Sequence, residues 1–196
     1  MVLDLNEYDA SYFDGARQRV SHNAGYSIYE RVRRFDGPAS TGELWQDRAR
    51  DLIARFDLVG KRVMDLGCAK GFVVEDLRSL GVDAYGCDVS GYAISQSSVL
   101  IRPYLLHGEA QVVLREFPDN QFDFITSRGF IECVDPTRLP ALIVEINRTA
   151  KKQAHFIHTD INLNFYTRLP LDEWARYGWK SGTVLIGIEG SIERVI

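Results

Sequence analysis

Apolar residues recur along residues 40–160 in two alternating patterns, a spacing of three and four and short unbroken runs. The three-and-four spacing predicts helices over about 41–57 and 72–80, after Ser90, and around 139–146. The short runs predict strands at 63–66, 82–87, 104–106, 122–126 and 154–159. Strands that alternate with helices pair in parallel through right-handed crossovers, so helices are expected on both faces of a sheet.

The end of the chain has a different pattern. A short helix is predicted at about 171–177, and two strands, 183–188 and 191–196, are separated only by Glu189-Gly190. Two strands so close in sequence must be antiparallel, because a parallel pair needs a crossover of a dozen or more residues. The predicted fold class is therefore α/β, a doubly wound, mostly parallel, seven-stranded Rossmann-like sheet with an antiparallel C-terminal edge.

Residues 1–39 lack a clear period and carry six aromatic residues before Gly37-Pro38. We interpret them as a lid or appendage on a main domain of residues 40–196. A chain of 196 residues suits one such domain.

The net charge of −4 disfavours a nucleic-acid binder, since neutralising phosphates requires clustered Lys and Arg. The three cysteines show neither disulfide nor metal-ligand spacing, so no metal is expected. The acidic N-terminus lacks an apolar leader and no run is long enough to span a membrane, which favours the cytoplasm. Nothing in the sequence indicates an oligomeric state.

One stretch points to chemistry. The strand predicted at 63–66 runs into a glycine turn, Asp65-Leu66-Gly67-Cys68-Ala69-Lys70-Gly71, which opens a helix, and Asp88 follows the next strand. This order of strand, turn, helix, strand and carboxylate is typical of sites for a nucleoside-bearing cofactor.

With the segments that follow it, this stretch resembles the class I S-adenosylmethionine-dependent methyltransferases along roughly residues 40–190. The segments are Gly86-Cys87-Asp88-Val89-Ser90, Gly108-Glu109-Ala110, Phe122–Ser127 and Ile131–Val134, in the family's order. Ala69 replaces the middle glycine of the family's loop, Glu109 replaces an aspartate, and Cys133 stands where many relatives have histidine. The resemblance implies S-adenosylmethionine as cofactor, with Asp88 accepting hydrogen bonds from the ribose hydroxyls. The residues that it implies for cofactor binding are Asp65, Gly67, Cys68, Gly71, Asp88, Val89, Glu109, Ala110 and Ser127.

Two other functions stay open. An NAD(P)-dependent oxidoreductase is the weaker Rossmann interpretation, because the spacing of Gly67 and Gly71 lacks the Gly-x-Gly-x-x-Gly pattern that brings backbone amides to a pyrophosphate. A non-catalytic cofactor-binding subunit is the other.

A methyltransferase of this size and charge is expected to act on nitrogen or oxygen of a small-molecule acceptor. Positioning and desolvation supply much of the catalysis of methyl transfer, so a dedicated base is not compulsory. Glu132 and His158 are the candidate catalytic residues, although Glu132 could serve as a cap or ion-pair partner and His158 as a structural histidine. The candidates for the acceptor pocket or lid are Tyr12, His22, Tyr26, Arg128 and Asp160.

Overall fold

The computed structural model describes residues 8–13, 41–160, 176, 183–188 and 191–194. The strands are β1 (Arg62–Leu66), β2 (Asp83–Asp88), β3 (Leu105–His107), β4 (Phe122–Arg128), β5 (Ala150–Asp160), β6 (Thr183–Ile188) and β7 (Ser191–Arg194). The α-helices are α1 (Ala10–Phe13), α3 (Thr41–Phe56), α4 (Phe72–Ser79), α5 (Gly91–Ser95), α6 (Ala110–Val113) and α7 (Leu139–Thr149). Three 3-10 turns join them, η4 (Arg102–Tyr104), η5 (Leu114–Glu116) and η6 (Ile131–Cys133).

The strands form one sheet in the order β3-β2-β1-β4-β5-β6-β7. Neighbours from β3 to β6 pair in parallel, and β7 pairs antiparallel with β6. The chain moves outward from β1 to β3 and then returns to place β4 on the other side of β1. In such sheets, ligands bind outside the carboxyl ends of the strands at this reversal. The α/β Rossmann-like fold predicted from the sequence is confirmed.

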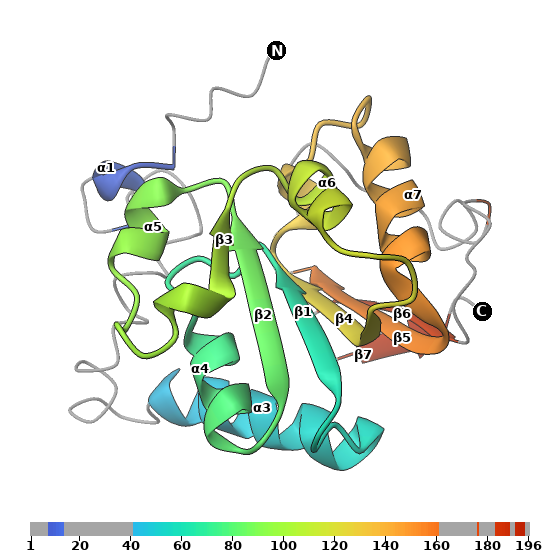
Figure 1. Cartoon of the computed structure of the whole chain (residues 1–196), viewed down its shortest axis with the longest axis horizontal. Helices are drawn as coiled ribbons and strands as arrows, with labels where there is room; N and C mark the ends of the chain where they lie inside the picture. The colour runs from blue at the N-terminus through green and yellow to red at the C-terminus, as the bar shows by residue number, and fades with distance from the viewer. Residues whose placement is uncertain (1–7, 14–40, 161–175, 177–182, 189–190, 195–196) are drawn as a thin grey trace.

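The sheet separates two hydrophobic layers. Val63 of β1 packs with residues of α3 and α4 on one face, whereas the next residue, Met64, packs with α6 and α7 on the other. Figure 1 shows these two pairs of helices on opposite sides of the strands. Phe122 and Phe124 of β4 are fully buried, and burying each side chain contributes about 1.5–3 kcal/mol.

Ion pairs hold the amino ends of the strands. Asp83, at the start of β2, accepts from Nε of Arg62 at 2.7 Å and from Nη1 of Arg78 at 3.2 Å. In the same way Nζ of Lys151, in β5, lies 2.7 Å from Oδ1 of Asp123 in β4. Each of these pairs joins two different elements and so fixes their relative position.

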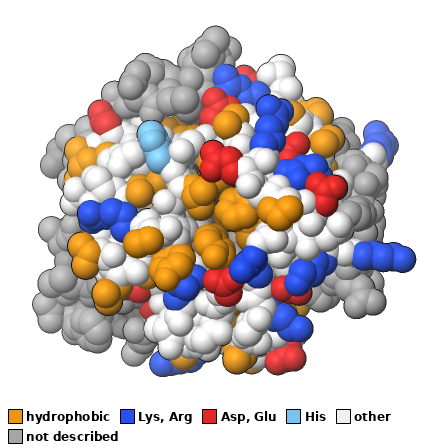
Figure 2. Space-filling model, viewed as in Figure 1, with side chains coloured by type: hydrophobic (Ala, Val, Ile, Leu, Met, Phe, Trp, Pro, Cys, Tyr) orange, Lys and Arg blue, Asp and Glu red, His pale blue; other side chains and the backbone are white. Residues whose placement is uncertain are grey.

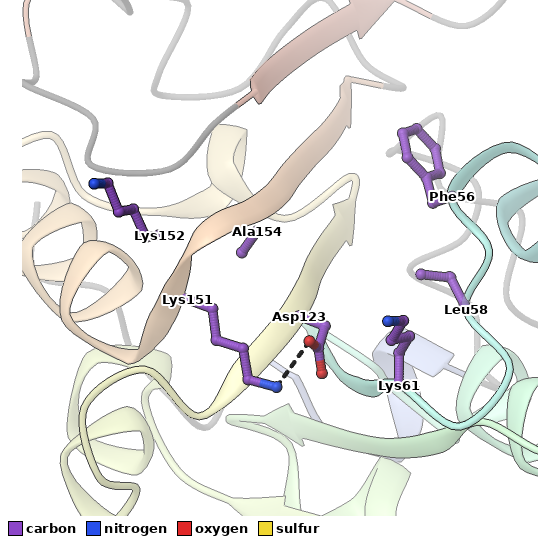
Figure 3. Close-up of a pocket in the computed structure, with 7 residues that line it drawn as sticks. All are labelled: Phe56, Leu58, Lys61, Asp123, Lys151, Lys152 and Ala154. Carbon is purple, nitrogen blue, oxygen red and sulfur yellow. Dashed lines mark hydrogen bonds and ion pairs between the residues drawn. The ribbon is translucent and has the colours of Figure 1, made fainter.

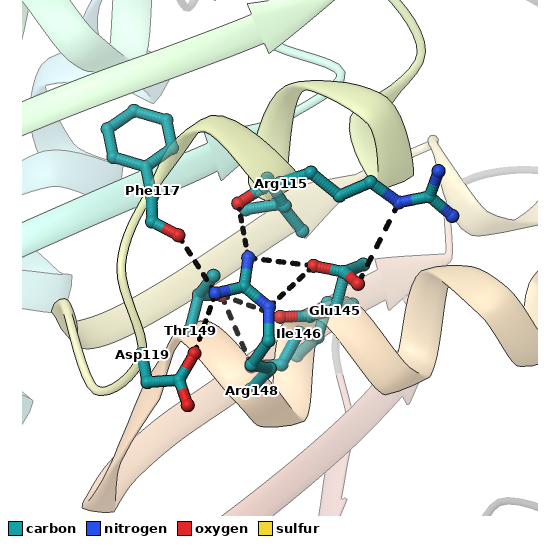
Figure 4. A network of polar contacts seen from close by, with 8 residues as sticks. Arg115, Phe117, Asp119, Glu145, Ile146, Arg148 and Thr149 are labelled. Carbon is teal, nitrogen blue, oxygen red and sulfur yellow. Dashed lines mark hydrogen bonds and ion pairs between the residues drawn. The ribbon is translucent and has the colours of Figure 1, made fainter.

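Arg148 forms a further network near the amino ends of β4 and β5 (Figure 4). Its guanidinium donates to the carbonyl oxygens of Leu114 and Phe117 at 2.8 and 2.9 Å, and to the carboxylates of Asp119 and Glu145, each at 2.8 Å. The side chain thus ties α7 to the segment that leads into β4.

Figure 2 shows hydrophobic side chains gathered near the middle of the face seen in Figure 1, where β2 and β3 lie. The ring of Tyr85 packs edge-on against Tyr104 and Phe117, at centroid distances of 5.9 and 6.0 Å. The guanidinium carbon of Arg78 lies 3.3 Å from the centroid of the Tyr104 ring. The arginine therefore both covers an aromatic ring and pairs with Asp83.

The predicted elements agree with the structure at most positions, although α6 and η5 were not predicted. The residue before a proline disfavours helical geometry, so the helix after Ser90 had to end before Pro103, and α5 ends at Ser95. The reason is local: Ser97 Oγ donates to the carbonyl of Ile94, and Arg102 donates to the carbonyls of Ser95 and Ser97. These bonds satisfy the helix's last carbonyls and stop it early. The short helix predicted at 171–177 lies outside the described residues, apart from Arg176.

Candidate functional site

The glycine turn between β1 and α4 folds back on the end of β2. The backbone N–H groups of Gly67 and Cys68 both donate to the carbonyl oxygen of Cys87, at 2.9 and 3.0 Å, and Gly71 N–H donates to the Cys68 carbonyl at 2.8 Å. Gly67, Ala69 and Gly71 have φ values of 74°, 50° and 77°. Every second residue of the turn is therefore left-handed.

Ala69 is the one left-handed residue of the turn that is not a glycine. An alanine replaces the family's middle glycine without strain only at a negative φ, and its φ here is positive. A left-handed conformation costs an alanine about 1–2 kcal/mol. The compensation is a hydrogen bond, since Ala69 N–H donates to Oδ2 of Asp88 at 2.8 Å.

Asp88, the last residue of β2, connects the turn to the next helix. Its second oxygen, Oδ1, accepts from the N–H of Ser90 at 2.8 Å. Burial raises the pKa of Asp88, and this effect exceeds the opposing hydrogen bonds from Ser90 and Ala69. An ionised carboxylate has about four acceptor sites, so two stay open beyond these backbone bonds. The arrangement fits the ribose-binding role that the resemblance implies.

Gly67 and Gly71 have no room for a side chain, in addition to having a positive φ. A Cβ on Gly67 would lie 2.7 Å from Cδ2 and 2.8 Å from Cβ of Phe130. A Cβ on Gly71 would lie 2.6 Å from Cδ1 of Ile101 and 2.7 Å from Cδ1 of Leu105. Side chains from distant parts of the chain therefore pack directly on the turn's backbone.

The segment after β3 holds the other cofactor candidates. Gly108 N–H donates to the backbone carbonyl of Asp88 at 2.9 Å, which places Glu109 and the buried Ala110 beside the end of β2. The carboxylate of Glu109 pairs with Nη1 of Arg138 at 2.8 Å and accepts from the side-chain amide of Gln111. An adenine amino group would share this carboxylate with Arg138 and Gln111.

Val89, the remaining candidate on this side, follows Asp88, and its carbonyl oxygen lies 3.0 Å from Nε2 of His107. His107 was not among the site residues predicted from the sequence. A contact between residues 18 positions apart leaves no local signal.

Ser127, Arg128, His158 and Asp160 lie at the carboxyl ends of β4 and β5. Ser127 is fully buried and aligns with Leu66 of β1 on one side and His158 of β5 on the other. Asp65, one residue earlier in β1, is also buried. The topology thus brings these candidates to one edge. The side chains of His158 and Asp160 lie outside the described part of the structure.

Glu132 lies in η6, directly after β4, and its side chain is likewise not described. The catalytic roles of Glu132 and His158 therefore stay predictions.

The described part of the N-terminal segment lies on the glycine turn. Phe13, at the end of α1, is buried against Ala69 and Ala93. The hydroxyl of Ser90 donates to the backbone carbonyl of Tyr8 and accepts from Ala93 N–H at 3.0 Å. The lid candidates His22 and Tyr26, and the side chain of Tyr12, fall outside the described residues.

Two of the three cysteine thiols, those of Cys68 and Cys87, are buried. Burial raises the pKa of the Cys68 and Cys87 thiols well above the ordinary range, which keeps both protonated and unreactive at neutral pH. The Cys68 side chain packs closely on Gly86 of β2, because a Cβ on Gly86 would lie 2.6 Å from the Cβ of Cys68. Among the described residues no cluster of three His, Cys, Asp or Glu side chains could hold a metal ion. None of the described helices is long and apolar enough to cross a membrane.

A pocket lies at the opposite edge of the sheet (Figure 3), lined by Phe56, Leu58, Lys61, Asp123, Lys151, Lys152 and Ala154. Its residues come from the amino ends of β1, β4 and β5 and from the end of α3. The Lys151–Asp123 ion pair occupies its polar side (Figure 3). The pocket is separate from the glycine turn and contains none of the predicted site residues.

Comparison with known proteins agrees with this geometry. A family model described as "Methyltransferase domain" matches residues 42–184. A SAM-dependent methyltransferase from Archaeoglobus fulgidus is 26% identical with a TM-score of 0.52, over 66% of this chain and 55% of that one. A putative S-adenosyl-L-methionine-dependent methyltransferase from Methanococcus maripaludis is 19% identical with a TM-score of 0.52, over 60% of this chain and 56% of that one. A SAM-dependent methyltransferase from Aquifex aeolicus is 22% identical with a TM-score of 0.50, over 71% and 76%.

The chain thus spans little more than half the length of the Archaeoglobus and Methanococcus structures. The two structures below 25% identity support the fold alone. No curated protein matches the chain.

Proposed function

We propose that this chain, which belongs to the methyltransferase-domain family, transfers a methyl group from S-adenosylmethionine to a small-molecule acceptor. The observation that carries the proposal is Asp88. Its carboxylate stands at the carboxyl end of β2, is held by backbone N–H groups of Ala69 and Ser90, and has acceptor capacity left for a ribose diol. The SAM-dependent methyltransferase from Archaeoglobus fulgidus shares this fold.

The order of the strands gives the bound cofactor its direction. With the ribose at Asp88 on β2, the adenine lies toward β3 and α6, where Ala110 supplies a buried apolar surface and Glu109 a hydrogen-bond acceptor. The methionine part then extends the other way, over Gly67 and toward β4. Asp65, buried near the end of β1, lies on that side, and we assign it to the cofactor's amino group.

When bound, the cofactor would supply a sulfonium methyl group, which an acceptor nitrogen or oxygen attacks in line while the carbon–sulfur bond breaks and S-adenosylhomocysteine leaves. The chain's own contribution is to position the acceptor and to exclude water. We place the acceptor over the ends of β4 and β5, beside Arg128 and Asp160. Glu132 and His158 are the candidates to take a proton from a hydroxyl or ammonium acceptor.

We assign the N-terminal segment, residues 1–39, to a lid over this edge, with Tyr12, His22 and Tyr26 facing the acceptor. The burial of Phe13 against Ala69 supports the assignment, because it places part of the segment on the cofactor turn. A small acceptor fits the net charge of −4, which disfavours nucleic acid. We also propose a cytoplasmic location.

The deciding experiment compares cofactors by thermal shift and calorimetry. A ligand that binds only the native state stabilises it by about 2.7 kcal/mol at a hundredfold excess over its Kd. We expect S-adenosylmethionine and S-adenosylhomocysteine to raise the Tm, and NAD and NADP to leave it unchanged. Stabilisation by the dinucleotides alone would favour an oxidoreductase. Binding of S-adenosylmethionine without turnover of any acceptor in a broad panel of amines and alcohols would favour a non-catalytic subunit.

A further inference from the structure

Phe130 lies directly on the cofactor turn. Its Cβ, Cγ and Cδ2 atoms all come within 2.9 Å of the position that a Cβ on Gly67 would take. A glycine here lets an aromatic side chain approach the backbone more closely than any other residue would allow. The ring belongs to the loop after β4, so it bridges the ends of β1 and β4.

The backbone around Phe130 is fixed on both sides. Gly129, just before it, has a φ of 60°, which turns the chain sharply after β4. The carbonyl of Phe130 accepts from Cys133 N–H at 2.9 Å, and the Cys133 thiol donates to the Gly129 carbonyl at 3.6 Å. The side chain packs on the buried cluster that contains Leu66 and Ile131, and it stays partly exposed. The ring is therefore held in place and remains partly exposed.

The strand order decides which part of a ligand meets this ring. In the proposed binding mode, the adenine and ribose would extend from α6 to Asp88, over β3 and β2. The sulfonium is bonded to the ribose C5′ and so lies on the side of β1 and β4. Phe130 lies in the loop after β4 and packs on the end of β1, where the proposed donor and acceptor sites would meet.

We propose that Phe130 presents its aromatic face to the sulfonium of the cofactor and thereby distinguishes the positively charged donor from the neutral product. This inference rests on the proposed cofactor. An aromatic face attracts a nearby cation, and the thioether of S-adenosylhomocysteine carries no charge to be attracted. The contact lowers the affinity for the product relative to the donor, which favours product release after methyl transfer.

The test is calorimetry of the full chain with S-adenosylmethionine and with S-adenosylhomocysteine. Phe130→Leu keeps an apolar side chain on Gly67 but removes the aromatic face. We expect its Kd for S-adenosylmethionine to rise about threefold to thirtyfold, the range that cation–π energies imply, and its Kd for S-adenosylhomocysteine to change less than about twofold. Phe130→Tyr should restore the wild-type ratio of the two constants.

Phe117→Leu is the matched control. Phe117 is a partly buried phenylalanine that packs on the same hydrophobic cluster, away from the turn, so both Kd values should stay unchanged. Equal losses of both ligands in Phe130→Leu would mean that the ring acts by packing alone, and unchanged affinities would mean that it does not face the ligand. Either result overturns the inference. If the wild-type protein binds neither ligand, the proposed function itself fails.

Discussion

The carboxyl ends of the strands form one edge of the sheet, the carboxyl edge, and their amino ends form the other, the amino edge. The two are built from different interactions. At the carboxyl edge, the carboxylate of Asp88 accepts one backbone N–H on each oxygen, and every second residue of the turn beside it is left-handed. At the amino edge, the carboxylates of Asp83 and Asp123 are satisfied by arginine and lysine side chains. Backbone donors are fixed in place and cannot follow a ligand, whereas long side chains adapt. The carboxyl edge is therefore preorganised, and the amino edge mainly joins elements.

The glycines of the two edges differ in the same way. Gly67 at the carboxyl edge and Gly60 at the amino edge have nearly the same φ, 74° and 72°. A Cβ on Gly67 would collide with Phe130, but a Cβ on Gly60 would meet no atom within 4 Å. Gly60 is thus needed for backbone conformation alone, and Gly67 for conformation and close packing.

The largest expected effect comes from substituting this matched pair. Gly67→Ala should lower the free energy of unfolding by about 3 kcal/mol, from left-handed strain of about 1–2 and overpacking of about 1–3 kcal/mol. Gly60→Ala should cost only the strain. Urea unfolding of both variants measures the difference, which at about 2–4 °C per kcal/mol is also visible in the Tm. Equal losses would show that Phe130 moves aside freely, and would remove the contrast between the edges.

Asp88→Ala should combine a stability loss with a binding loss. It removes the acceptor for the N–H groups of Ala69 and Ser90, and an unsatisfied buried donor costs about 1–3 kcal/mol. It also removes two charge-assisted bonds to the ribose, so the Kd for S-adenosylmethionine should rise roughly tenfold to several hundredfold. Calorimetry on the folded variant measures the second effect. An unchanged Kd would place Asp88 outside the cofactor site.

Arg148→Met tests the opposite edge. It breaks the links to the Leu114 and Phe117 carbonyls and to Glu145, which is mostly buried. We expect a loss of about 2 kcal/mol in the free energy of unfolding, at the middle of the range for lost charged hydrogen bonds. The Kd for S-adenosylmethionine should stay within about twofold, because the network lies at the other end of β4. A large change in that Kd would mean that the edges are coupled.

As the pH is lowered, cofactor binding at the carboxyl edge and stability at the amino edge should be lost at different pH values. Burial raises the pKa of Asp88, so this carboxylate takes up a proton at a higher pH than an ordinary aspartate. The ionised form accepts from the ribose, so affinity for S-adenosylmethionine should fall by up to tenfold per pH unit once the pH is below that raised pKa. Protonating Asp88 does not destabilise the fold, because a raised pKa in the folded state means that the charged form is the costly one.

At the amino edge, the carboxylate pKa values are shifted in the opposite direction. Burial alone would raise the pKa of Asp83 and Asp123, but hydrogen bonds from Arg62 and Arg78 to Asp83, and from Lys151 to Asp123, lower both. Their contribution to stability is present above the unfolded pKa of about 4 and is lost as the pH falls below it. Binding should therefore be lost before the fold. Calorimetry and circular dichroism at matched pH values check the order, and simultaneous loss would contradict it.

Sequence and structure agree best where the signal is local. The helix at 41–57 and the strands at 63–66 and 82–87 were predictable because their periodicity and caps lie within each segment. Asp88 was recognisable from its spacing after the glycine turn. Phe130 was not, because its contact with Gly67 joins residues 63 positions apart, and neither was the bond from Ser90 to Tyr8, across 82 positions. Such contacts exist only once the sheet has assembled.

The smallest expected effect concerns Ala69, the one non-glycine residue among the left-handed positions of the turn. Ala69→Gly relieves strain of about 1–2 kcal/mol. It also removes a methyl group that packs on Phe13 and Ala93, and it increases the conformational entropy of the unfolded chain. Together these two losses are about as large as the strain that is relieved. The free energy of unfolding should therefore change by less than about 1 kcal/mol in urea. The N–H bond to Asp88 is kept, so the Kd for S-adenosylmethionine should change less than about threefold. A stabilisation above about 1.5 kcal/mol would mean that the Ala69 methyl contributes little to holding α1 on the turn, and that the carboxyl edge carries strain for its backbone geometry alone.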